Sequence, residues 1–239
     1  MSTAMPVVVR ARTAVYSAFA LNGFFMASWV SRIPSVRDTL GLSAGGLSVL
    51  LLSLSLGSVI AMPLAGAVVL RIGRARTVFG GALAISVGLL ALALAVDGLR
   101  LVPLAAAGLF VAGAGTACWD VSMNVEGSAV ERRLDRAIMS RFHASWSLGT
   151  VVSAGVGVLL LALGVATWVH LCAVAVLVVV GAGWATRHFL DSQPSETDGR
   201  PAPAGIGLGR AWREPRTLLI GVLVLCMAFV EGTANDWLA

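Results

Sequence analysis

An acidic residue, Asp120, stands inside a long apolar stretch of the chain. Residues around it recur at spacings of three and four, namely Gly113, Thr116, Asp120 and Asn124. On a helix this spacing places them on one face. A carboxylate within a membrane span is costly and is usually turned inward to serve protons, ions or a substrate. The pattern predicts that Asp120 couples to protons or solute, unless it lies lower in the span, near the headgroups.

Other polar and aromatic residues interrupt apolar stretches. Asn22 lies in the middle of the first stretch, where it could join helices by a hydrogen bond or contact a substrate. Trp146 could stack on the C–H face of a sugar or anchor a helix at the membrane interface. Glu231 lies about 14 residues into the last stretch, which is roughly 21 Å along a helix. The candidate set for substrate and proton coupling is Asp120, Asn124, Asn22, Glu231, Trp119 and Trp146.

Membrane helices are needed to position these side chains. The chain is 58% hydrophobic and 12% charged, with a mean hydropathy of +0.90. Soluble domains average roughly 45–50% apolar and roughly 25% charged residues, so this chain needs lipid as its solvent. The apolar runs predict an all-α protein with seven spans, the fifth and sixth forming a tight hairpin around Gly164. These spans are Ala14–Val30, Leu47–Leu70, Val78–Val96, Leu101–Val125, Ala144–Leu163, Thr167–Thr186 and Thr217–Ala239.

The basic residues predict the orientation of the spans. All 17 are Arg, and with the N-terminus inside, the inner segments hold 14 of them against 3 in the outer loops, Arg32, Arg37 and Arg100. Cytoplasmic loops carry such an excess of positive charge. We therefore expect a multi-pass protein of a plasma membrane, or a bacterial inner membrane, with a cytoplasmic N-terminus. The segment from Glu126 to Arg141 is expected to be a solvated amphipathic connector.

A segment rich in Pro, Ser and Gly near residue 200 predicts a division of the chain. The expected organisation is a six-helix bundle over residues 1–190, a cytoplasmic linker over 191–213 and a seventh helix over 214–239.

The loop between the second and third predicted spans holds a specific motif, Gly66-Ala-Val-Val-Leu-Arg71-Ile-Gly73-Arg74-Ala-Arg76. It resembles the loop signature of the major facilitator superfamily, which has a Gly, an acidic residue and then a basic-x-Gly-Arg-x-basic run. Leu70 stands at the acidic position. The resemblance implies a gating role for Gly66, Arg71, Gly73, Arg74 and Arg76.

A second resemblance is to sugar–proton symporters of the fucose permease type. Cys118-Trp119-Asp120-x-x-x-Asn124 is similar to their fourth helix, Met139–Gly149 to the start of their fifth, and the run from Glu231 to their seventh. Those symporters have an Asp where Ser31-Arg32-Ile33-Pro34 stands here. The resemblance implies transport of a small solute by alternating access, coupled to protons, with a sugar as one candidate. An exporter of drugs or metabolites from the same superfamily is an alternative.

The resemblance covers one six-helix half of that fold and the first helix of an incomplete second half. We expect either a truncated, non-transporting fragment or a half that assembles with a second half-transporter chain or as a homodimer. Neither paired carboxylates nor a two-His metal spacing occurs in the spans, so neither an enzyme nor a metal site is expected. No cofactor is expected either. The arginines are spread between spans rather than gathered in one patch, which argues against nucleic acid.

Overall fold

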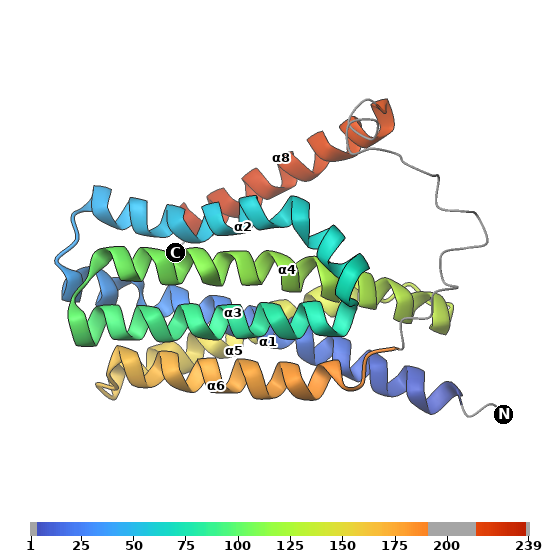
Figure 1. The fold of residues 1–239 in the computed structure, drawn as a ribbon, viewed down its shortest axis with the longest axis horizontal. Helices are drawn as coiled ribbons and strands as arrows, with labels where there is room; N and C mark the ends of the chain where they lie inside the picture. The colour runs from blue at the N-terminus through green and yellow to red at the C-terminus, as the bar shows by residue number, and fades with distance from the viewer. Residues whose placement is uncertain (1–3, 191–213, 238–239) are drawn as a thin grey trace. The chain divides into compact units, whose positions relative to one another are not determined.

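The computed structural model describes residues 4–190 and 214–237, and these ranges consist of helices joined by short connections, without a strand. The chain divides into two compact units, residues 1–192 and 193–239, which are considered separately (Figure 1). The first unit contains α1 (Ala4–Leu40), α2 (Ala44–Ile72), α3 (Arg74–Ala93) continued by the π-helix η1 (Leu94–Leu99), α4 (Val102–Leu134), α5 (Met139–Ala162) and α6 (Thr167–Thr186).

The all-α membrane fold expected from the sequence is confirmed. In the described ranges, five helices are long and apolar enough to cross a membrane: α2, α3 with η1, α4, α5 and α6. The α1 helix is not among them, and the polar residues Asn22, Ser28 and Arg32 lie in its middle and C-terminal parts. All three are buried, so these polar groups face protein rather than lipid.

The pattern of helix–helix contacts in α1–α3 of the first unit is repeated in α4–α6. α1 packs against α5, α6 and α4, while α4 packs against α2, α3 and α1, and α3 also contacts α6. Exchanging α1 with α4, α2 with α5 and α3 with α6 therefore reproduces these contacts. The two repeats have opposite orientations, since α4 runs antiparallel to α1 (Figure 1).

The fifth and sixth spans are joined as the sequence predicted, but they do not form a tight hairpin. Gly164 makes the turn with a φ of 68°, a conformation that glycine adopts without strain. Beyond this turn, α5 packs mainly against α1, and α6 packs against α1 and α3. The prediction of a hairpin was wrong because α1 offers each helix a larger contact than they offer each other.

Glycines allow the closest helix contacts of the first unit. A Cβ atom built at Gly149 of α5 would overlap the backbone carbonyl of Ala20 in α1, and one at Gly113 of α4 would overlap that of Leu54 in α2. The α1–α5 and α2–α4 contacts are equivalent in the two repeats. Close approach at small residues is how membrane helices gain van der Waals contact when lipid provides no hydrophobic driving force between them.

Gly149→Ala is expected to destabilise the first unit because α1 and α5 must move apart. Overpacking of this kind costs typically 1–3 kcal/mol. Gly155, on the same helix, is the matched control, since a Cβ atom there would meet nothing within 4 Å. Thermal unfolding in detergent should show a lower midpoint for Gly149→Ala and an unchanged or higher midpoint for Gly155→Ala. Equal midpoints for the two variants would contradict this account of the contact.

The second unit contains α8 (Pro215–Trp237). Proline is favoured in the first turn of a helix because its missing N–H is not needed there. The predicted seventh helix is therefore present, while the predicted linker, residues 191–213, lies outside the described residues.

Candidate functional site

Three of the candidate residues, from three different helices, form one cluster. Asn22 of α1 is only 2% exposed. Its Oδ1 atom accepts a hydrogen bond of 2.9 Å from Nε1 of Trp146 in α5, and its side chain adjoins the Asp120 carboxyl of α4. Asn22 thus connects the predicted carboxylate to the predicted tryptophan.

The Asn22 amide and the Asp120 carboxyl are buried side by side, and the amide is a hydrogen-bond partner of the carboxyl. Such a donor and acceptor can exchange their mutual contact for hydrogen bonds to a hydroxyl-bearing solute or a water, and the carboxyl can also take up a proton.

The other residues of the predicted α4 face have mixed roles. Thr116, Asp120 and Asn124 are partly buried, while Gly113 lies in the contact with α2. Nδ2 of Asn124 donates to the backbone oxygen of Asp120 over 2.8 Å. The amide of Asn124 is therefore turned back onto its own helix, close to the carboxylate.

Trp119 and Glu231 are not part of the cluster in the described structure. The Trp119 side chain is fully buried and lies against Gly81 of α3, so it packs between α3 and α4. Glu231 belongs to α8 in the second unit, and its side chain lies outside the described residues. Its coupling role stays a prediction.

The segment predicted to be a gating loop is mostly helical, and only one residue separates α2 from α3. Gly66 lies within α2, and Gly73 is the single residue between α2 and α3, with a φ of 86° that favours glycine. Arg71 and Arg76 are exposed. Arg74, in contrast, is 8% exposed and makes an ion pair of 2.8 Å between its Nε atom and Oε2 of Glu126.

Glu126 was expected in a solvated connector, and this prediction was wrong because α4 continues to Leu134 and buries it completely. Its Oε1 atom accepts from the backbone N–H of Leu190 over 2.6 Å. Arg74 donates from Nη2 to the oxygen of Leu190 over 3.2 Å. The Ser122 hydroxyl donates to the oxygen of Arg74. This network joins the α2–α3 turn, α4 and the segment after α6.

A second buried cation, Arg32, was also not predicted from the sequence. Arg32, expected in an outer loop, lies within α1 and is 2% exposed. It donates from Nε to Nδ1 of His170 in α6 and from Nη1 to the backbone oxygen of Val165, both over 2.9 Å. The physical reason is that α1 extends to Leu40 and places Arg32 against the start of α6, so it pairs within the protein.

The family model described as Major Facilitator Superfamily matches residues 15–238. The chain belongs to the major facilitator superfamily. Members of this superfamily carry nested inverted repeats of three helices in each six-helix half, which accounts for the repeated packing of α1–α3 and α4–α6.

Two bacterial relatives of this superfamily member are named as transporters. An uncharacterized transporter, y4wD, of Sinorhizobium fredii is 32% identical over 94% of this chain and 57% of its own length. An uncharacterized MFS-type transporter of Yersinia pestis is 33% identical over 93% of this chain and 55% of its own length. The membrane protein MosC of Rhizobium meliloti is 27% identical, over 94% and 52% respectively. The chain spans about half the length of these relatives.

Proposed function

We propose that this chain is part of a proton-coupled transporter of a small solute that works by alternating access. The observation that carries the proposal is the cluster of Asn22, Asp120 and Trp146, which places a buried amide, a carboxyl and an indole from three helices side by side. A carboxylate within a membrane span marks solute or proton pathways in transporters. Protonation of Asp120 would remove its charge and so change the stability of a state in which it is enclosed.

A hydroxyl-rich solute such as a sugar suits the chemistry of this cluster. The Asn22 amide can donate to a hydroxyl and the Asp120 carboxylate can accept from one. The Trp146 indole, fixed by its hydrogen bond to Asn22, offers an apolar face next to these groups. The similarity of residues 118–124 to sugar–proton symporters of the fucose permease type supports the same solute class. Asn124 and Glu231 are proposed as further contacts on the solute or proton path.

The second wall of the transport path is proposed to come from another bundle. Candidates are the remainder of a longer protein, a second half-transporter chain or another copy of this chain. The Arg74–Glu126 network is proposed to act at the gate, because it connects three elements on one side of the bundle. The arginine bias and the bacterial relatives support an inner-membrane location with the N-terminus in the cytoplasm.

Proteoliposomes containing the assembled transporter, in which this chain is joined by the bundle that forms the second wall, provide the test. A panel of monosaccharides is added outside vesicles while a pH-sensitive dye reports the outer solution. Symport predicts that at least one sugar enters and that the outer solution becomes transiently alkaline as protons enter with it, an effect absent from empty vesicles. Sugar entry without alkalinisation would contradict proton coupling, and no entry of any sugar would contradict sugar transport by this chain.

A further inference from the structure

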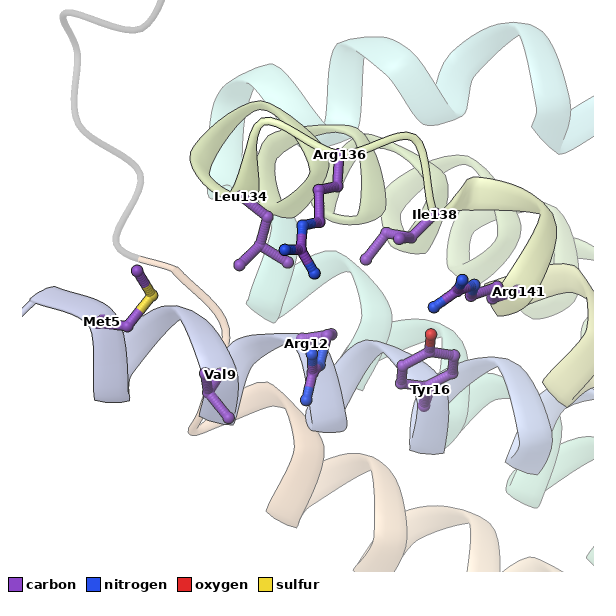
Figure 2. A pocket seen from close by; sticks show the side chains of 8 residues that line it. All are labelled: Met5, Val9, Arg12, Tyr16, Leu134, Arg136, Ile138 and Arg141. Carbon is purple, nitrogen blue, oxygen red and sulfur yellow. The ribbon is translucent and has the colours of Figure 1, made fainter.

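A basic cavity lies at the end of the bundle where α1 begins. It has a volume of about 270 Å³ and lies between the first turns of α1 and the connection from α4 to α5 (Figure 2). The side chains that line it are Met5, Val9, Arg12, Tyr16, Leu134, Arg136, Ile138 and Arg141. Three of these eight are arginines and none is acidic.

The three arginines are not neutralised within the described ranges. The guanidinium groups of Arg12, Arg136 and Arg141 make no hydrogen bond or ion pair with another described residue. Glu131, an acidic residue next to this region, uses its Oε1 atom for the backbone N–H groups of Ile138 and Met139, and so holds the start of α5 in place.

All three cations line the same cavity. Figure 2 shows Arg136 reaching from the α4–α5 connection toward α1, and the Tyr16 hydroxyl pointing from α1 toward that connection, near Arg141. Like charges facing one cavity repel one another. An anion between them would remove that repulsion, and the guanidinium fork matches phosphate oxygens in two parallel hydrogen bonds. The Tyr16 hydroxyl adds a further donor.

We propose that this cavity binds a phosphate-bearing anion, with an anionic phospholipid headgroup and a free phosphate compound as its two sources. The position of the cavity fits a headgroup, because Arg12 and Tyr16 lie on either side of Ala14, where the first apolar stretch begins. Basic pockets between membrane helices on the cytoplasmic side bind such headgroups. The apolar side chains of Met5, Val9 and Leu134 would contact the less polar part of a lipid.

The test uses the full chain purified in a neutral detergent, in wild-type form and as Arg12→Gln/Arg141→Gln. Thermal unfolding and native mass spectrometry are recorded with phosphatidylglycerol, with phosphatidylcholine and with inorganic phosphate. The matched control is Arg71→Gln/Arg76→Gln, which removes two exposed arginines outside the cavity. The proposal expects the cavity variant to weaken binding of the anion about tenfold or more, since it removes charge-assisted hydrogen bonds, and expects the control to bind as the wild type does.

The arms of this experiment separate the two sources. Binding of phosphatidylglycerol but not inorganic phosphate, lost in the cavity variant, would identify a lipid site. Binding of inorganic phosphate with the same loss would identify a site for a free phosphate compound. Absence of both, equal binding of phosphatidylcholine, or an equal loss in the control variant would overturn the proposal.

Discussion

Asp120→Asn is expected to abolish proton-driven accumulation of the solute while the protein still inserts into the membrane. Asparagine has almost the same size as aspartate and retains an acceptor oxygen beside Asn22, but it cannot exchange a proton. One charge moved across 100 mV corresponds to about 2.3 kcal/mol, which sustains a gradient of roughly 50-fold for a solute coupled to one proton. The variant should therefore accumulate the solute only to its outside concentration, a loss of roughly 50-fold at 100 mV.

The measurement compares uptake against a gradient with solute exchange at equal concentrations on both sides. Asp120→Asn should lose the first and retain the second, because exchange needs binding and alternation but no net proton movement. Asp135→Asn is the matched control. Asp135 is exposed and has a φ of 48°, a conformation that Asn also tolerates. Full accumulation by Asp120→Asn would refute its coupling role, and a loss in Asp135→Asn would point to a general effect of the substitution.

Glu126→Gln is expected to destabilise the first unit more than any other substitution proposed for it. The Arg74 guanidinium would keep its buried position beside α4 but lose the carboxylate 2.8 Å away. Breaking a buried ion pair by removing one partner typically costs 3–5 kcal/mol, since the other charge is left uncompensated. Glutamine still offers an oxygen to the N–H of Leu190, so this hydrogen bond can be kept while the charge is removed.

Unfolding midpoints and the yield of monodisperse protein in detergent would measure this effect. The double variant Arg74→Gln/Glu126→Gln removes both charges and is expected to be more stable than Glu126→Gln alone, although less stable than the wild type. A single variant as stable as the wild type, or a double variant less stable than the single one, would show that the buried charge of Arg74 is compensated elsewhere.

The sequence was sufficient to predict the fold class and the residue at the centre of the candidate site. Seven helices follow from apolar runs of membrane-spanning length, and composition excludes a soluble domain. Asp120 could be chosen as a candidate from the sequence because a carboxylate within a membrane span usually serves the passage of protons, ions or a substrate. Gly164 and Gly73 marked turns because the chain needs a positive φ there. Each of these inferences depends on a property of one segment and its nearest neighbours.

Which helices meet, and therefore which polar groups pair, was decided only by the tertiary structure. Asn22 and Trp146 are 124 residues apart in the chain and share a hydrogen bond. Arg32 and Glu126 were assigned to solvated segments, yet each is buried beside a partner from another helix, His170 and Arg74 respectively. An apolar run shows that a helix enters the membrane. It does not show whether a charged residue at the end of that run is exposed to water or buried beside an oppositely charged or polar partner. The free energy of burying that charge depends on the partner, and the partner is brought to it by the packing of helices that are distant in sequence.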